Sequence, residues 1–262
     1  MNAFKLHSFP GIRPIAVLIF SFLYIPIIVL VLLSFNQGEL TTVWQGLGLN
    51  GYIEIWQDPY IIQAAKNSFI VALIATLVAT PSATLAALAL WQRQSDDRSI
   101  IASLIGLPLL IPGIVVAVAT LMLFSFIGLK LSLFTVIIAH STFCIPFAYF
   151  PIKTRLSKIH FNLVDAATDL YANSWQAFWH ITWPQLLPGI IAGALLSFIT
   201  SMDDFIITYF VSGPGSATLP VYIFGAIKRG ISPKINAVST LILGISILFV
   251  TVSYFTGRQA QR

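Results

Sequence analysis

The segment DAATDLYANSWQAFWHITWP, residues 165–184, separates two strongly apolar runs and differs from both. It begins with an acidic residue, it is rich in aromatic side chains, and it is too long for a tight turn. Asn173 tolerates a left-handed turn conformation, and Ser174 is suited to cap a following helix. We therefore expect two helical pieces joined by a break at 171–174.

Large side chains in and before this segment follow one another at spacings of three and four. This spacing predicts that they share one helical face. The face comprises Phe161, Val164, Thr168, Tyr171, Trp175 and Phe178. Exposed aromatic groups of this kind need a cover. They lie either on the membrane surface or in a groove of a partner protein.

The composition indicates a membrane protein. Of 262 residues, 57% are hydrophobic and 9% are charged, whereas soluble domains carry about a quarter charged residues. The net charge of +5 comes without a basic cluster interleaved with aromatics, which argues against nucleic-acid binding. Cys144 is the single cysteine and the four histidines are dispersed, so we expect no disulfide and no metal site. We find no nucleophile and base pair and expect no catalytic residue.

Six apolar runs are long enough to span a bilayer, which takes roughly 20 residues. They cover about 12–34, 67–91, 100–127, 131–152, 186–211 and 235–256. We expect an all-α protein with a single membrane domain over 1–262 and a loop over 153–185. Alanines recur every third or fourth residue in the second span, which favours close helix packing.

The distribution of Lys and Arg predicts the orientation. With six spans, both termini lie on one side, and the positive-inside rule places that side in the cytoplasm. The residues on it are Lys5, Arg13, Arg93, Arg98, Lys153, Arg155, Lys158, Arg258 and Arg262, against Lys66, Lys130, Lys228, Arg229 and Lys234 opposite.

Asp203 and Asp204 interrupt the fifth span, although a carboxylate at the bilayer centre costs about 2.5–3.5 kcal/mol. Asp204 falls on a small and polar stripe at helical spacing, so we expect it to face a pathway more directly than Asp203. The stripe is Gly189, Gly193, Ser197, Thr200, Ser201, Asp204 and Thr208. Phe205 and Tyr209 would add aromatic faces that suit a cation. Alternatively, the aspartates bond neighbouring helices or cap a kink.

His140 lies in the fourth span without an acid one helical turn away. We interpret it as a hydrogen-bonded packing residue rather than as part of a proton relay.

The loop resembles the signature loop of ABC importer permeases, whose pattern is Glu-Ala-Ala, a turn glycine, then Ile, one residue, Leu-Pro. The chain has Asp165-Ala166-Ala167, then Tyr171, then Ile181, one residue, and Trp183-Pro184. A left-handed Tyr171 would cost roughly 1–2 kcal/mol, so we expect the turn to move to Asn173. The resemblance implies a type I permease fold and a coupling helix that docks on an ATPase. The docking residues would be Asp165, Ala166, Ala167, Tyr171, Ala172, Trp175, Ile181 and Pro184.

A second run, Ser201-Met202-Asp203-Asp204-Phe205, is similar to the second permease subunit of spermidine/putrescine importers. The resemblance implies polyamine transport across a bacterial inner membrane. The implied partners are a homologous permease, two ATPase subunits and an extracytoplasmic polyamine-binding protein. The chain has no Gly-x-x-x-x-Gly-Lys-Ser/Thr loop, so ATP and Mg would bind to the ATPase and no cofactor to this chain. The pathway would use Asp204, Asp203, Ser201, Thr208, Tyr209 and Phe205.

Three alternatives remain. Permeases for ferric iron or other small solutes share much of the pattern. A secondary transporter would work alone on an ion gradient. An intramembrane enzyme would need two carboxylates that face each other, which adjacent residues on one helix do not provide.

Overall fold

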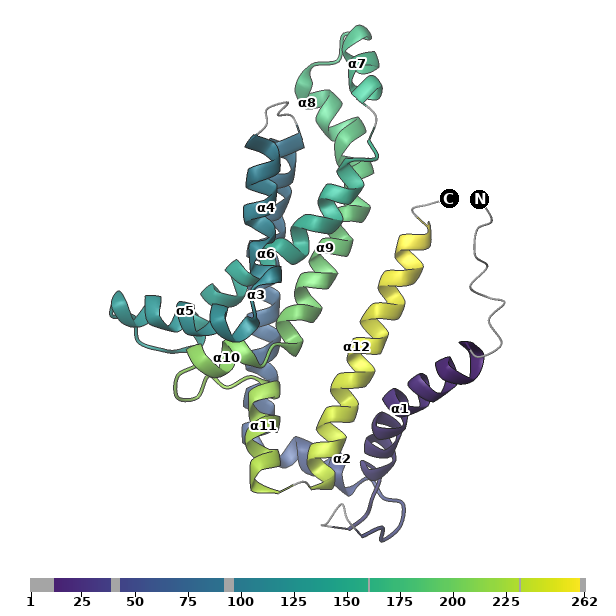
Figure 1. The fold of residues 1–262 in the computed structure, drawn as a ribbon, viewed down its shortest axis with the longest axis vertical. Coiled ribbons are helices and arrows are strands. Elements are labelled where there is room, and N and C mark those ends of the chain that lie inside the picture. Colours follow the sequence, from purple (N-terminus) through teal and green to yellow (C-terminus); the bar gives the residue numbers. More distant parts are fainter. Residues whose placement is uncertain (1–11, 39–42, 92–96, 160, 231, 260–262) are drawn as a thin grey trace. The chain divides into compact units, whose positions relative to one another are not determined.

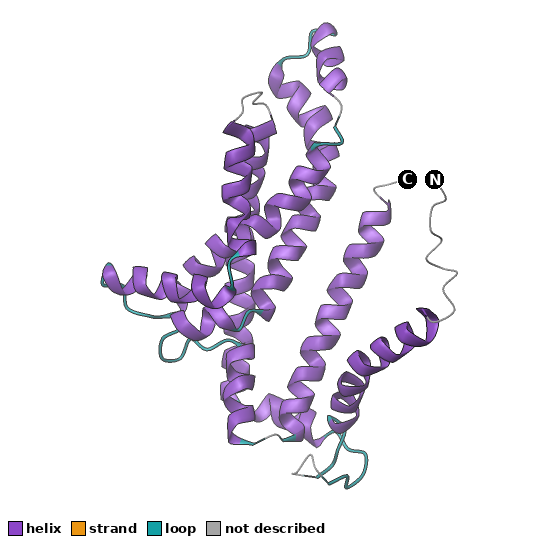
Figure 2. Ribbon diagram, in the orientation of Figure 1, coloured by secondary structure: helices purple, strands orange, loops and turns teal. Residues whose placement is uncertain are grey.

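The computed structural model describes the chain except for residues 1–11, 39–42, 92–96, 160, 231 and 260–262. Figure 2 shows helices joined by loops, with no strand in the described part. An isolated bridge between Asn36 and Leu47 is the exception to helix and loop among these residues. The predicted all-α class is confirmed.

The helices follow one another along the chain as Figure 1 labels them. They are α1 (Ile12–Leu33), α2 (Asn50–Gln57), α3 (Pro59–Trp91), α4 (Asp97–Leu110), α5 (Gly113–Phe126), α6 (Leu133–Leu156), α7 (Phe161–Asp169), α8 (Ser174–Ala177), the π-helix η2 (Phe178–Thr182), α9 (Trp183–Asp203), α10 (Ile206–Val211), α11 (Leu219–Arg229) and α12 (Pro233–Gln259).

Four described helical stretches have the length and apolar character to cross a membrane: α1, α3, α6 and the stretch from α8 through η2 to α9. A fifth crossing is obtained if α4 and α5 form one bent span. Within the described side chains α12 contributes a shorter apolar stretch, Pro233–Leu248. The six predicted spans therefore all fall on helices, although two of them are broken.

The third predicted span, 100–127, is not one helix. α4 ends at Leu110, α5 begins at Gly113, and the two are bent by 101°. Pro112 precedes α5 directly and adopts φ −53° and ψ 130°. Because proline lacks an N–H and pushes the preceding residue away from the helical region, the sequence at Pro112 favours a break.

By its internal contacts the chain divides into two compact units, residues 1–58 with 225–244 and residues 59–224 with 245–262. A single domain over 1–262 therefore stays a prediction. In the first unit the Lys234 Nζ lies 2.9 Å from Asp58 Oδ2, and the Ser34 hydroxyl lies 2.7 Å from that of Tyr52. These contacts tie the start of α12 to the end of α2, and α2 to the end of α1.

The second unit is built on α3, α6 and α9, which lie side by side (Figure 1). The alanine stripe of α3 is buried, as predicted, with Ala72, Ala75, Ala79 and Ala83 fully covered. On α9, a Cβ added to Gly193 would lie 2.7 Å from the carbonyl oxygen of Ala148 on α6. The absence of a side chain at Gly193 thus lets two helix backbones meet.

Candidate functional site

The elbow formed by α7, α8 and η2 occupies the predicted loop 153–185. α7 ends in a Schellman motif, in which Ala172 N–H donates to Ala167 O and Tyr171 N–H to Thr168 O, both at 3.0 Å. Tyr171 is left-handed, with φ 62°. These two hydrogen bonds satisfy carbonyls that the end of α7 would otherwise leave unpaired.

The predicted move of the turn to Asn173 is wrong. Asn173 has φ −76°, and the left-handed residue is Tyr171, where the family pattern has glycine. The Tyr171 side chain is 98% exposed, so it meets no neighbour that would add to the backbone cost. The hydrogen bonds of the motif therefore fix the turn position despite the tyrosine.

Ser174 was expected to cap the second piece, but Asn173 does so. The Asn173 carboxamide accepts the Gln176 N–H at 2.8 Å, and the Gln176 side chain accepts the Asn173 N–H at 2.9 Å. This reciprocal pair is a capping box. Because the chain reverses between α7 and α8, the single helical face expected from Phe161 to Phe178 does not form. The side chains of Phe161 and Val164 lie outside the described residues.

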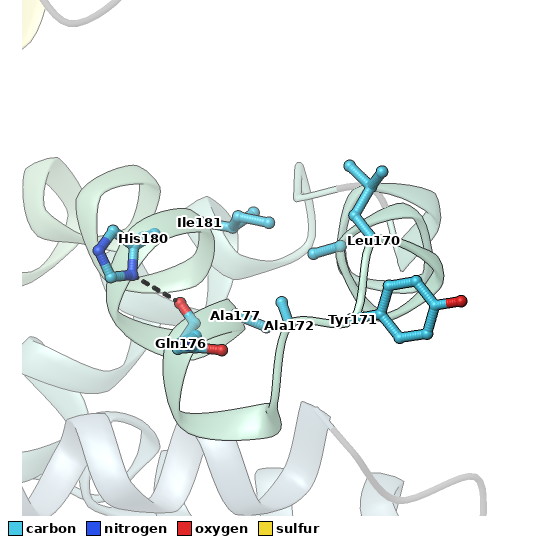
Figure 3. A pocket seen from close by; sticks show the side chains of 8 residues that line it. Leu170, Tyr171, Ala172, Gln176, Ala177, His180 and Ile181 are labelled. Carbon is cyan, nitrogen blue, oxygen red and sulfur yellow. Dashed lines mark hydrogen bonds between the residues drawn. The ribbon is translucent and has the colours of Figure 1, made fainter.

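An open pocket of about 410 Å³ lies inside the elbow. Figure 3 shows Leu170 and Tyr171 on one side, His180 and Ile181 on the other, and Ala172 and Ala177 between them. Its lining also includes Ala167 and Gln176. Because the alanines in the lining have short side chains, they leave the space of the pocket open.

Four of the predicted docking residues, Ala167, Tyr171, Ala172 and Ile181, line this pocket. The other four are exposed beside it and do not line it: Asp165, Ala166, Trp175 and Pro184. Trp175 instead begins an aromatic row with Trp179 and Trp183, whose ring centroids are 5.6 and 5.2 Å apart in succession. The elbow thus presents a pocket and, separately, an aromatic face.

The second region is a break in the predicted fifth span, 186–211. α9 ends at Asp203, Asp204 is extended with φ −68° and ψ 125°, and α10 starts at Ile206. The Asp204 carboxylate accepts the N–H groups of Ile207 and Thr208, at 3.4 and 3.0 Å. It therefore satisfies orphan donors at the start of α10, which a continuous helix would not have.

His140 of α6 is fully buried against this break. Its Nδ1 lies 2.7 Å from the Ser201 hydroxyl, and its Nε2 lies 2.9 Å from the Thr208 hydroxyl and 3.3 Å from Asp204 Oδ2. The expectation of a hydrogen-bonded packing histidine is confirmed. Its acidic partner was missed because it comes from another helix, and a search within one span cannot find it.

The two aspartates have different environments. Asp204 is 11% exposed in its side chain and bound on several sides. Asp203 is exposed, and within the described part of the chain it has no hydrogen bond or ion pair. Asp204 therefore fits the alternative in which an aspartate bonds a neighbouring helix and caps a break, and the expectation that it faces a pathway stays a prediction. The predicted stripe is a packing face, because Gly189, Gly193, Ser197 and Ser201 are buried on α9.

An aromatic cluster adjoins the break. Phe205 lies 5.3 Å from Tyr209 and 4.6 Å from Phe224, centroid to centroid, and Tyr209 lies 5.9 Å from Phe224. Phe205 and Tyr209 were predicted, whereas Phe224 of α11 was not, since nothing in its local sequence marks it. Among the residues described, no three or more His, Cys, Asp or Glu side chains gather as a metal site would need.

The family model of the binding-protein-dependent transport system inner membrane component matches residues 83–261. The chain belongs to this family. It is therefore an inner-membrane permease subunit of an ABC importer, a transport component rather than an enzyme.

Known relatives of the permease match nearly its whole length. The spermidine/putrescine transport system permease protein PotC of Escherichia coli (strain K12) is 33% identical over 92% of this chain and 91% of its own. The putrescine transport system permease protein PotI of the same organism is 34% identical over 100% of this chain and 96% of its own. The resemblance to polyamine importer permeases that the sequence indicated is confirmed.

Solved structures share the fold. A chain of a bacterial alginate ABC transporter, solved with an alginate pentasaccharide-bound periplasmic protein, superposes with a TM-score of 0.71 at 21% identity, covering 94% of this permease and 92% of that chain. A chain of the inward-facing MetNI methionine ABC transporter superposes with a TM-score of 0.67 at 15% identity, covering 80% of this permease and 99% of that chain. At these identities the likeness shows the ABC permease fold alone.

Proposed function

We propose that this permease conducts polyamines, spermidine or putrescine, inward across the bacterial inner membrane. The observation that carries the proposal is the 33–34% identity to PotC and PotI over at least nine tenths of the chain. Both relatives are named as polyamine permeases, and the match to PotI extends over the whole chain.

The chemistry of the break supports a cationic cargo. A polyamine is a chain of methylenes with two or more ammonium groups, so it requires carboxylates and aromatic faces. Asp203 offers an exposed carboxylate, and Phe205, Tyr209 and Phe224 form an aromatic cluster that begins two residues later. An ammonium over such rings gains about 0.5–2 kcal/mol. Asp203, rather than the bound Asp204, is the pathway carboxylate in this proposal.

The energy source in this proposal is a separate pair of ATPase subunits. They bind ATP and Mg, and this chain binds neither. The elbow pocket, lined by Ala167, Ala172 and Ile181, receives a residue of the ATPase surface. A homologous second permease completes the pathway, and an extracytoplasmic polyamine-binding protein delivers the cargo. Both termini lie in the cytoplasm with the elbow, in keeping with the Lys and Arg bias.

The test is uptake by the assembled importer in proteoliposomes that contain ATP and are supplied with the binding protein. Labelled spermidine, putrescine, ferric ion and sulfate are compared. We expect ATP-dependent uptake of a polyamine only. Uptake of ferric ion in place of polyamine would overturn the cargo, and flux through this chain alone under an ion gradient would overturn the ATPase partnership.

The role of Asp203 is tested in the same assay. We expect Asp203→Asn to lower polyamine uptake about tenfold through loss of a charge partner worth over 1 kcal/mol. Asp203→Glu is the matched control, since it retains the charge and should restore much of the uptake. Unchanged uptake by Asp203→Asn at limiting polyamine removes Asp203 from the pathway.

A further inference from the structure

His140 contacts both sides of the break between α9 and α10. Ser201 lies on α9, Asp204 lies within the break, and Thr208 lies on α10, and all three are within hydrogen-bond reach of the two ring nitrogens. His140 and Thr208 are fully buried and Ser201 is 2% exposed. One side chain of α6 therefore holds the end of one helix and the start of the next.

The directions of these hydrogen bonds are mutually consistent. The Thr208 hydroxyl donates to Asp204 Oδ2 at 3.3 Å, so its oxygen is left to accept from His140 Nε2–H. In the neutral ring the other nitrogen, Nδ1, then accepts from the Ser201 hydroxyl. The His140 ring N–H and the hydroxyls of Ser201 and Thr208 each then have an acceptor, and a ring in another orientation would leave a buried side chain unpaired.

A second contact of α6 fixes the far end of α10. The Thr135 hydroxyl lies 2.7 Å from the carbonyl oxygen of Val211, the last residue of α10, and 2.7 Å from that of Ser132, and it can donate to either. α10 is thus held on α6 at its start through His140 and at its end through Thr135. Asp203 comes two residues after Ser201 on α9, so it points about 200° away from the side of α9 that faces His140 of α6, and it is exposed.

We propose that His140 is a positioning residue, which fixes the break between α9 and α10 so that Asp203 is presented to the transport pathway. This inference rests on the proposed function for the role of Asp203. The orientation of Asp203 itself is independent of the cargo and is measured separately.

Thiol labelling in the assembled importer measures that orientation. The background variant is Cys144→Ser, which removes the single cysteine and keeps a donor toward the Ser197 carbonyl. Asp203→Cys then reports accessibility to a quaternary-ammonium methanethiosulfonate. We expect His140→Gln to slow labelling roughly tenfold, because the accessible orientation becomes a minor population.

Ser197→Ala is the matched control. The Ser197 hydroxyl donates to the Cys144 carbonyl at 3.2 Å and so also links α9 to α6, but one helical turn before Ser201 and away from the break. It should leave the labelling rate unchanged. Equal slowing by Ser197→Ala and His140→Gln would mean that any lost contact between α6 and α9 moves Asp203, which overturns a specific role for His140.

If His140→Gln fails to assemble, Thr208→Val and Ser201→Ala decide the matter, since each removes one hydroxyl with little change in shape. Both variants should slow the labelling of Asp203→Cys, as His140→Gln is expected to do. A normal labelling rate in both variants overturns the proposal.

Polyamine uptake provides the functional readout through a double-mutant cycle. If His140 acts through Asp203, His140→Gln combined with Asp203→Asn takes up polyamine no more slowly than Asp203→Asn alone. If the double variant instead loses uptake by the product of the two single losses, His140 does not act through Asp203. Slowed labelling together with normal uptake by Asp203→Asn would instead remove Asp203 from the proposed function while retaining the positioning role of His140.

Discussion

Tyr171 occupies a backbone position that residues other than glycine rarely adopt. Its φ of 62° costs roughly 1–2 kcal/mol relative to a right-handed conformation. Two hydrogen bonds of the Schellman motif and the capping box of Asn173 hold the chain there despite that cost. The elbow therefore keeps its shape with a tyrosine in place of the glycine of the family pattern.

This strain predicts different effects on proteolysis for two substitutions at Tyr171. Tyr171→Val places a β-branched side chain at positive φ and should raise the population of an opened elbow, so that limited proteolysis between α7 and α8 accelerates roughly tenfold. Tyr171→Gly should not accelerate it, because glycine removes the strain.

Leu170→Val is the matched control for the proteolysis, since Leu170 is the exposed neighbour without a positive φ. Equal acceleration by Leu170→Val and Tyr171→Val would show that β-branching alone, and not the left-handed backbone, controls opening.

At the scale of elements, the contact between α6 and α9 organises the larger unit. Gly193 lets the backbones approach, the Ser197 hydroxyl donates to the Cys144 carbonyl, and His140 binds Ser201 further along. A small residue, a hydroxyl and a polar network thus follow one another along the interface. In lipid such packing and interhelical hydrogen bonds replace the hydrophobic effect as the source of association.

Gly193→Ala should destabilise this contact, since the added Cβ would lie 2.7 Å from a backbone oxygen that cannot rotate away. We expect a loss of about 1–3 kcal/mol, seen as a lower Tm of the purified permease in detergent. Gly244→Ala on α12 is the matched control, because a Cβ there meets nothing within 4 Å. A Tm for Gly193→Ala equal to that of Gly244→Ala would contradict the close approach.

At the scale of the whole molecule, the proposed function requires that ATP hydrolysis in a partner act on the pathway through this chain. The proposed docking pocket is formed by α7, α8 and η2, and η2 continues directly into α9, which ends at the acidic break. One continuous helical stretch, Ser174–Asp203, therefore connects the elbow to the break. A continuous helical connection of this kind suits a coupling element.

Ala167→Arg should uncouple the importer, because a long charged side chain fills part of the pocket in which the ATPase is proposed to dock. We expect polyamine uptake to fall by about tenfold or more while the ATPases still hydrolyse ATP, since a cleft contact worth over 1 kcal/mol is lost. The measurement is the ratio of polyamine uptake to ATP hydrolysis, both determined in the same proteoliposomes.

Ser157→Arg is the control for this uncoupling, as it adds the same charge to an exposed position of the same loop outside the pocket. Normal co-purification and uptake with Ala167→Arg would contradict docking in the pocket.

The sequence alone determined the class of protein and the family. Low charge and six long apolar runs require lipid, and the spacing in 165–184 identifies the elbow, because both signals lie in contiguous residues. The tertiary structure decided which residues meet. Periodicity describes the faces of one unbroken helix, so it could not predict that α9 ends at Asp203 or that His140 of another helix binds Asp204. Which of the two adjacent aspartates is bound and which is exposed depends on hydrogen bonds across helices, and those form only when α6, α9 and α10 pack together.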